Sequence, residues 1–336
     1  MRAPRISVLL PVRDAGTALG ACLDSLAAQT LADHEVVAVD DGSSDESRAC
    51  LRERSARDPR IRLLEASGCG LVAALTQALE AARAPLAARM DADDVAHPER
   101  LRLQAERLES DTSVDVLGSR VTLGARPGAA PGQGMRSYVA WVNGLMGHEQ
   151  MARDRFVESP IVHPSVAMRT AALRRLGYRG FDGPEDYDLW LRAFEAGLRF
   201  AKLEAALVEW RDSPRRLTRT DVRYSPAAFR RLKVEALSRG PLSGRSAVVW
   251  GAGPVGKAFA RALQGAGRRV AGFVEVDTRK IGETIHGAPV VAVGDACGFR
   301  GVLHLAAVAR PGARERIRAE AARLGLVDGI DLVAVA

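Results

Sequence analysis

Short apolar runs alternate with longer amphipathic stretches along the first part of the chain. The apolar runs are bounded by turn residues and predict buried strands. The stretches between them carry apolar residues at helical spacing and predict helices. The expected strands cover residues 6–12, 35–39, 61–65 and 85–90, and the expected helices cover 17–29, 45–57 and 71–82. This alternation predicts an α/β fold, with a mainly parallel sheet flanked by helices on both faces.

Two of the expected strands end in acidic turns. Asp91-Ala92-Asp93-Asp94 follows the apolar run at 84–90, and Asp40-Asp41-Gly42-Ser43 follows the run at 36–39. Ligands of an open parallel sheet bind beyond the carboxyl ends of its strands, so we expect both turns to face one crevice. Carboxylates this close repel one another, which indicates either a solvated loop or the ligands of a hard cation. For each turn taken alone, the hydrophilic loop stays an equal alternative.

The alternation continues past His97-Pro98 and then becomes irregular. Residues 99–109 predict a helix, 114–123 a strand and 126–134 a Gly/Pro-rich loop. A further helix is expected at 186–196, and its start is acidic, with Glu185, Asp186 and Asp188. Acids at a helix amino end also complement the helix dipole, which is the structural alternative to a functional role. Between 211 and 244, prolines in an Arg-rich stretch predict a linker with one helix at about 227–238.

The C-terminal part begins a new strand–helix–strand pattern. The strand at 246–250 leads into Gly251-x-Gly253-x-x-Gly256, which opens a helix, and the next strand ends at Glu275. Such glycines allow a pyrophosphate to approach a helix amino end, and Glu275 or Asp277 would bind ribose hydroxyls. We therefore expect a Rossmann-like domain that binds a nucleotide, a nucleotide sugar or NAD(P), or that serves only in packing or homo-oligomerisation.

Composition narrows the function classes. The 336 residues suit about two domains, and no apolar run is long enough to span a membrane. The net charge is +7, but nearly all basic residues are arginines spread along the chain without aromatic interleaving. This argues against specific nucleic-acid binding and favours anionic small substrates or loose contact with an acidic membrane surface. The four cysteines lack metal-site spacing and are expected to be reduced packing thiols.

Four segments, taken in chain order, resemble the family 2 glycosyltransferases across about residues 5–225. The resemblance implies the GT-A fold and transfer of a sugar from a nucleoside diphosphate donor to an acceptor hydroxyl, usually with Mg²⁺ or Mn²⁺. The pathway expected from it is the assembly of a surface polysaccharide, glycolipid or glycosylated metabolite. The segments are Ile6-Ser7-Val8-Leu9-Leu10-Pro11-Val12, Val39-Asp40-Asp41-Gly42-Ser43, Arg89-Met90-Asp91-Ala92-Asp93-Asp94 and Glu185-Asp186-Tyr187-Asp188-Leu189-Trp190.

The resemblance also assigns a donor side to the site. Pro11, Arg13 and Asp41 match positions that contact the nucleotide base. Asp91 is expected to face the ribose or the metal, and Asp93 to coordinate the metal directly. Asp94 is expected to orient the turn.

On the acceptor side, Asp186 matches the catalytic base of the family. An inverting transfer needs a carboxylate that deprotonates the acceptor hydroxyl, and Glu185 is the alternative. His163 would line the donor diphosphate or the acceptor site, with a buried structural histidine as an equal alternative. Arg211 belongs to a segment that would close over the donor, or to a simple basic linker.

The expected domains are a GT-A glycosyltransferase domain at 1–225, a helical linker at 226–243 and a Rossmann-like domain at 244–336. The Tyr-Asn usual after Pro-Val is replaced by Arg13-Asp14, which leaves the donor base open. Processive-synthase motifs are missing, which favours single addition by a cytoplasmic enzyme or one peripheral to the inner face of the membrane. A nucleotide-sugar oxidoreductase or epimerase centred on the glycine-rich segment, and a non-catalytic nucleotide-sugar sensor, are the alternative functions.

Overall fold

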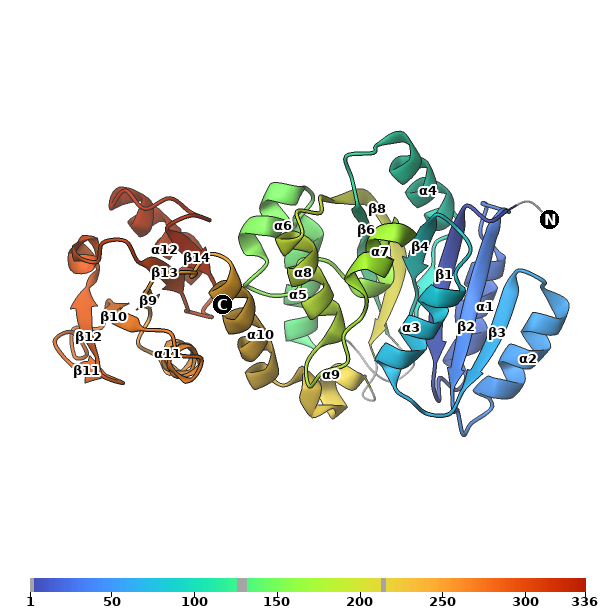
Figure 1. The fold of residues 1–336 in the computed structure, drawn as a ribbon, viewed down its shortest axis with the longest axis horizontal. Helices are drawn as coiled ribbons and strands as arrows, with labels where there is room; N and C mark the ends of the chain where they lie inside the picture. The colour runs from blue at the N-terminus through green and yellow to red at the C-terminus, as the bar shows by residue number, and fades with distance from the viewer. Residues whose placement is uncertain (1–2, 126–131, 213–215) are drawn as a thin grey trace. The chain divides into compact units, whose positions relative to one another are not determined.

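The structure is a computed structural model that describes residues 3–125, 132–212 and 216–336 (Figure 1). The chain forms two compact units. The first consists of Met1–Met151 and Ile161–Thr220, and the second of Ala152–Pro160 and Asp221–Ala336. No helix in the described ranges has both the length and the apolar character needed to cross a membrane.

The first unit is built on an eight-stranded sheet with strand order β3-β2-β1-β4-β7-β6-β8-β5. Strands β1 to β4 run parallel, while β7 runs antiparallel to β4 and β6, and β5 runs antiparallel to β8. The carboxyl ends of β1, β2 and β4 therefore meet at one edge. The strands are β1 (Ile6–Val12), β2 (His34–Asp41), β3 (Ile61–Ala66), β4 (Leu86–Arg89), β5 (Val95–Ala96), β6 (Val116–Ala125), β7 (Ala167–Arg169) and β8 (Phe200–Asp212).

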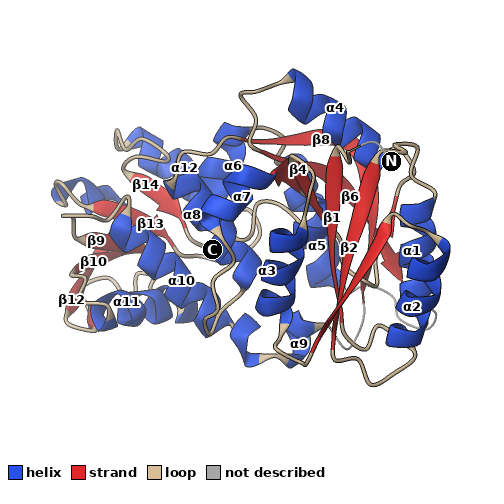
Figure 2. Cartoon of the chain, turned by 45° about the vertical axis from the view of Figure 1, so that its right-hand side comes forward, coloured by secondary structure: helices blue, strands red, loops and turns tan. Residues whose placement is uncertain are grey.

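Helices cover both faces of this sheet (Figure 2). Successive strand residues point to opposite faces, so Val8 and Leu10 pack with α1, α2 and α4, while Leu9 packs with α3, α7 and α8. These helices are α1 (Ala18–Ala27), α2 (Ser47–Arg57), α3 (Leu71–Ala81), α4 (Arg100–Ser110), α7 (Thr170–Leu176) and α8 (Glu185–Glu195). The remaining elements before residue 221 are α5 (Gln133–Gly144), α6 (His148–Asp154), η1 (His163–Ser165) and α9 (Leu217–Thr220).

The second unit is built on a six-stranded sheet with order β11-β12-β10-β9-β13-β14. Its pairs are parallel except for β11 with β12. The strands are β9 (Ala247–Trp250), β10 (Val270–Glu275), β11 (Thr284–Ile285), β12 (Ala288–Ala292), β13 (Leu303–Ala306) and β14 (Leu332–Ala334). The helices are η2 (Val222–Tyr224), α10 (Pro226–Arg239), α11 (Pro254–Gly265), η3 (Val293–Gly298) and α12 (Ala313–Arg323).

The segment 152–160 belongs to this second unit because buried polar groups attach it there. Lys233 on α10 donates to the carbonyl oxygens of Val157 and Val335, at 2.7 and 3.1 Å. Asp154 pairs with Arg318 of α12. The chain therefore enters the second unit briefly before returning to η1.

The fold class expected from the sequence, a mainly parallel α/β sheet flanked by helices with a second, smaller α/β part, is confirmed. Three details of the prediction are wrong. Gln133 and Gly134 begin α5 instead of ending a loop, and residues 126–131 of that expected loop lie outside the described residues. β8 continues to Asp212, into the stretch predicted as linker. Cys69 and Cys297 are exposed instead of packed inside.

Candidate active site

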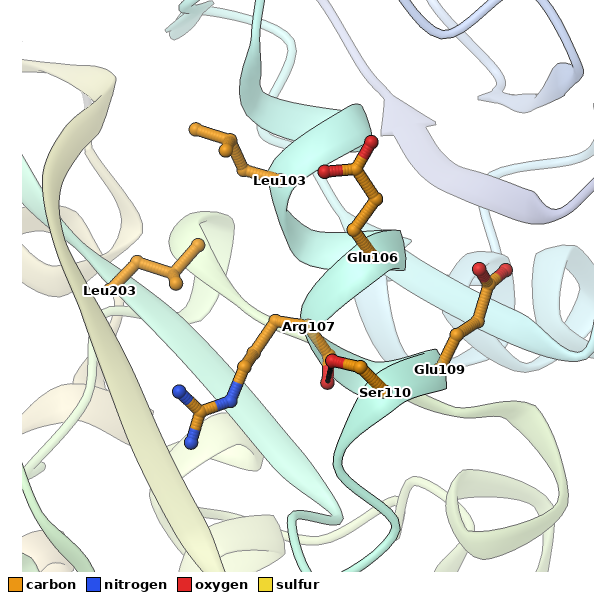
Figure 3. Close-up of a pocket in the computed structure, with 6 residues that line it drawn as sticks. All are labelled: Leu103, Glu106, Arg107, Glu109, Ser110 and Leu203. Carbon is orange, nitrogen blue, oxygen red and sulfur yellow. Dashed lines mark hydrogen bonds between the residues drawn. The ribbon is translucent and has the colours of Figure 1, made fainter.

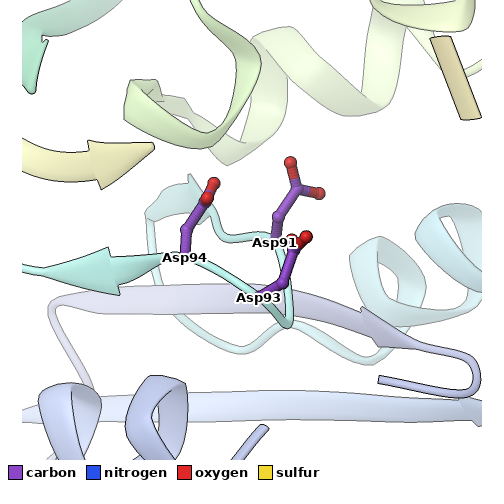
Figure 4. Close-up of side chains that lie close together, drawn as sticks. All are labelled: Asp91, Asp93 and Asp94. Atoms are coloured by element: carbon purple, nitrogen blue, oxygen red, sulfur yellow. The ribbon is translucent and has the colours of Figure 1, made fainter. Parts of the chain in front are cut away.

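Three carboxylates of the acidic turn after β4 lie close together. The ligand oxygens of Asp91, Asp93 and Asp94 lie within 4.8 Å of one another (Figure 4). Asp94 is buried, and its Oδ1 accepts a hydrogen bond from the backbone amide of Arg211, at 2.8 Å. Its other oxygen, Oδ2, is buried and has no hydrogen-bond partner among the described residues. An orphaned buried oxygen beside two further carboxylates fits a hard, oxygen-seeking cation.

Two buried arginines lie beside and beneath this turn. Arg89, the last residue of β4, places Nη2 2.5 Å from Asp91 Oδ1. Arg100 on α4 is fully buried and donates to the carbonyl oxygen of Arg89, at 2.6 Å. Burial lowers the pKa of Arg100 to about 10, with the charge of Asp94 acting in the opposite direction. Neither arginine is among the site residues expected from the sequence. For Arg89 the sequence does contain an indication, because this arginine interrupts an otherwise apolar strand.

The acidic amino end of α8 lies near the same turn. Burial raises the pKa of the Tyr178 hydroxyl, and among the charges acting on it those of Glu185, Asp186 and Asp91 raise it further. Tyr178 is therefore within electrostatic range of both acidic segments. Glu185 is buried and Asp186 is partly exposed, with Asp186 Oδ1 accepting from the Tyr187 amide at 2.7 Å.

Asp188, the third acid of this helix, has a structural role. It is buried and pairs with Arg179 at 2.6 Å and with Arg192 at 2.7 Å. Both of its oxygens are thus engaged by guanidinium groups. The other two acids in the first turn of this helix are Glu185 and Asp186.

His163 lies in the short helix η1, buried among aromatic rings. Its Nε2 is 3.2 Å from the Tyr178 hydroxyl, and its ring meets that of Trp190 edge to face at 5.5 Å. Burial, together with the charge of Arg89, lowers its pKa well below the ordinary value. The imidazole is therefore neutral near pH 7 and suited to hydrogen bonding instead of ion pairing.

The turn after β2 carries Asp41, whose side chain is nearly inaccessible. Its carboxylate accepts from the amides of Cys69 and Gly70, at 2.7 and 2.9 Å, and so fixes the turn that begins α3. Arg13 reaches within 3.7 Å of Asp41 and is more than half exposed. Pro11 pairs in register with Val39 on the neighbouring strand. These residues gather at the edge where the acidic turn also lies.

Arg211 lies near the end of β8. Besides its amide bond to Asp94, its side chain pairs with Glu209 at 2.8 Å. The guanidinium of Arg216 lies 4.1 Å from the ring centre of Trp210. The expected basic segment is thus attached to the acidic turn through backbone and is held by an aromatic ring.

In the second unit, the glycine-rich turn joins β9 to α11 as the sequence predicts. Glu275 Oε2 accepts from the Ala252 amide at 2.8 Å, and its Oε1 accepts from the amide of Val276. A Cβ at Gly251 would meet Val308, and one at Gly256 would collide with the Gly251 carbonyl, whereas a Cβ at Gly253 would meet nothing. Of these three glycines, only Gly253 therefore has open space where a side chain would lie.

A shallow depression of about 640 Å³ lies between α4 and β8 (Figure 3). Glutamate, arginine, serine and leucine side chains line it, and none of them belongs to the predicted site. They are Leu103, Glu106, Arg107, Glu109, Ser110 and Leu203. We assign it no function.

Comparison with known families gives one match over half of the chain. Residues 7–177 match the family model described as glycosyl transferase family 2. EpsE of Bacillus subtilis (strain 168), named as a glycosyltransferase, is 29% identical over 228 residues, covering 66% of this chain and 78% of EpsE. Chondroitin synthase of Escherichia coli is 29% identical over 113 residues, covering 34% of this chain and only 16% of that enzyme.

Two solved structures resemble the fold. TarS 1–349 of S. aureus in complex with UDP-GlcNAc has a TM-score of 0.54 at 19% identity, covering 70% of this chain and 66% of TarS 1–349. The mannosyltransferase PcManGT from Pyrobaculum calidifontis, in complex with GDP-Man and Mn²⁺, has a TM-score of 0.52 at 19% identity. That match covers 80% of this chain and 76% of PcManGT. At this identity the likeness establishes the fold alone.

Proposed function

Because the chain belongs to glycosyl transferase family 2, we propose that it is a metal-dependent, inverting glycosyltransferase. It would move a sugar from a nucleoside diphosphate donor to an acceptor hydroxyl in the assembly of a surface polysaccharide, glycolipid or glycosylated metabolite. The observation that carries the proposal is the carboxylate cluster of Asp91, Asp93 and Asp94, lying within range of the acidic end of α8.

The carboxylate cluster supports a divalent cation, Mg²⁺ or Mn²⁺. Asp91 and Asp93 would coordinate it, and the orphaned Oδ2 of Asp94 offers a third oxygen. When bound, such an ion supplies positive charge to the departing diphosphate. The solved structure of PcManGT, which shares the fold, is a complex with GDP-Man and Mn²⁺.

Asp186 is our choice for the base that takes the proton of the acceptor hydroxyl. It begins α8, is partly exposed and shares the surroundings of Tyr178 with Asp91. Glu185 is more buried and is the second choice. His163, neutral and hydrogen-bonded to Tyr178, would orient the donor or the acceptor without carrying charge.

Arg13 and Asp41 would form the part of the donor site that faces the base, next to Pro11. Asp41 contributes through the turn at Cys69 and Gly70, which its carboxylate orders. The guanidinium of Arg13 is exposed enough to stack on a base or meet a phosphate. Arg211 would approach the diphosphate from the end of β8.

The second unit is proposed to be a Rossmann-like nucleotide-binding domain. The open space above Gly253 supports this, since a pyrophosphate would need it. Gly251 and Gly256 would shape the turn, and Glu275 would order it through the Ala252 amide. Nucleotide, nucleotide sugar and NAD(P) remain the candidate ligands.

The test is turnover against a panel of nucleotide sugars, comparing wild type with Asp186→Asn. We expect activity with Mn²⁺ or Mg²⁺ and a loss of about 100-fold or more in the variant, because general-base catalysis contributes about that much. Glu195→Gln, at the exposed far end of the same helix, is the matched control. Full activity in Asp186→Asn rejects the base. Donor binding without turnover of any donor by the wild type favours the sensor alternative.

A further inference from the structure

Arg89 is a charged side chain in a place where charge is costly. It ends β4, and only 5% of its side chain is exposed. An unpaired guanidinium is strongly unfavourable in a buried position, so its partners indicate why a charge is tolerated there. One partner is the Asp91 carboxylate at 2.5 Å, and another is the carbonyl oxygen of Met90. Arg89 thus contacts Asp91, the first residue of the acidic turn, and Met90, the residue before it.

The same guanidinium also acts on groups outside that turn. Burial alone would lower the pKa of Arg89, but the charges of Asp91, Tyr178 and Glu185 hold it above its ordinary value. Its own charge in turn lowers the pKa of His163. These residues come from the acidic turn, from η1 and from the segment 178–185 that leads into α8. Arg89 therefore lies within electrostatic range of both acidic segments, and its direct contact is with Asp91 at 2.5 Å.

One donor of this guanidinium is unused. Arg89 Nε is buried and has no hydrogen-bond partner among the described residues. An unsatisfied buried donor destabilises the folded protein, because it has given up its hydrogen bond to water. Replacing Arg89 alone by an apolar side chain would also leave the Asp91 carboxylate without this partner. The cost is understandable if the position of the guanidinium matters for function.

We propose that Arg89 is a positioning residue that holds Asp91, on the donor side, and the acidic amino end of α8, on the acceptor side, at a fixed spacing. The inference rests on the proposed function, in which Asp91 meets the metal and Asp186 meets the acceptor. Without a cation between them, Asp91 and Glu185 would repel each other and move apart. Arg89 keeps both segments near one reaction centre.

The affinity of the protein for a metal ion distinguishes a positioning role of Arg89 from a purely electrostatic one. Removing a positive charge beside a cation site, with nothing else changed, strengthens cation binding. Releasing Asp91 from its position weakens cation binding instead, because a ligand is lost. The direction of the change in Arg89→Met therefore decides between the two roles.

The experiment measures Mn²⁺ binding by electron paramagnetic resonance, together with hydrogen exchange of the metal-free protein over residues 90–96 and 185–190. Arg89→Met is compared with Arg62→Met. Arg62 forms an ion pair with Glu35 at 3.0 Å near the opposite, amino-terminal edge of the sheet. Arg89→Lys keeps the charge and loses the planar fork. Where Arg89→Met does not fold, the double variant Arg89→Met/Glu185→Gln, which also removes the charge that Arg89 faces, replaces it.

In Arg89→Met we expect the Mn²⁺ dissociation constant to rise about tenfold or more, with faster exchange in both segments. Arg62→Met should change neither, and Arg89→Lys should fold without recovering the affinity. Equal or tighter Mn²⁺ binding with unchanged exchange in Arg89→Met overturns the proposal, as does wild-type behaviour of Arg89→Lys. If the wild type neither binds Mn²⁺ nor uses any donor, the proposed function fails, and hydrogen exchange alone decides the role of Arg89.

Discussion

The carboxylate of Asp94 accepts a hydrogen bond from the backbone amide of Arg211 at 2.8 Å, although the two residues are 117 positions apart. This bond joins the acidic turn after β4 to the end of β8. Because it uses the backbone of Arg211, it does not depend on which side chain that position carries. Burial, followed by the charges of Asp91 and Asp93, raises the pKa of Asp94 well above its ordinary value.

Replacing Asp94 by Asn and by Ala should separate the two roles of this side chain. Asn keeps an acceptor for the Arg211 amide and removes a buried charge, so we expect the metal-free protein to be at least as stable as wild type. Ala leaves the amide unpaired and should cost about 1–3 kcal/mol. Both variants should bind Mn²⁺ more weakly. Thermal unfolding with and without Mn²⁺ measures this, and an unfolding temperature of Asp94→Asn well below wild type would contradict it.

Asp93→Ala tests the metal assignment more directly. Asp93 is partly exposed, so its loss should affect folding little, while a lost ligand should weaken Mn²⁺ binding and activity by about 100-fold. The measurement is a Mn²⁺ titration of turnover and of binding. Asp111→Ala is a suitable control, because Asp111 is an acid following α4 that lies outside the cluster. Unchanged Mn²⁺ dependence in Asp93→Ala would remove this residue from the ligand set.

The part of the fold that the sequence predicts well is the part whose strands contain short apolar runs and are buried on both faces. β1, β2 and β4 are buried along their whole length, and such strands stand out between amphipathic helices. β8 was missed because its middle residues 204–206 are exposed and interrupt any regular pattern. What places β8 is its pairing with β6, a contact between distant segments that local pattern does not contain.

The candidate site, too, could be predicted from the sequence only in part. Acidic residues at strand ends are visible in the sequence because their position follows from the strand before them. The partners of those acids are less visible. Arg192 lies four residues after Asp188 and could have been paired with it from helix geometry. Any residue except proline would supply the backbone amide that meets Asp94 at position 211, so the sequence gives no sign of this bond.

His304 should make the second unit sensitive to acid. The Trp250 indole N–H donates to His304 Nδ1 at 2.9 Å, so protonation at Nδ1 would break this bond. Burial is the main cause that lowers the pKa of His304 to about 4. An unfolded histidine takes up a proton near pH 6.5, so between about pH 6.5 and pH 4 the unfolded state binds more protons. Stability should therefore fall as the pH falls through this window.

The matched variant is His304→Asn, whose side-chain oxygen lies where Nδ1 lies and can accept from Trp250 without titrating. We expect it to lose less stability than wild type between pH 6.5 and pH 4, followed by tryptophan fluorescence in urea. His34 and His163 also have lowered pKa values, so part of the acid sensitivity should remain. The same pH dependence in both proteins would show that His304 does not contribute.

Substitution by Ala should destabilise the second unit at Gly256 but not at Gly253. A Cβ at Gly256 would lie 1.8 Å from the backbone oxygen of Gly251, so Gly256→Ala must distort the turn and should cost about 1–3 kcal/mol or more. A Cβ at Gly253 would meet no atom within 4 Å, and its φ of −84° suits any residue. Gly253→Ala should therefore fold like wild type. If a pyrophosphate lies over this turn, however, the added methyl group at residue 253 would occupy part of its space.

Isothermal titration calorimetry with UDP, GDP and NAD⁺ counts the binding sites for this test. We expect Gly253→Ala to lose one site and to keep the donor site of the first unit. Equal site numbers in the two proteins would leave the glycine-rich turn with a packing role alone.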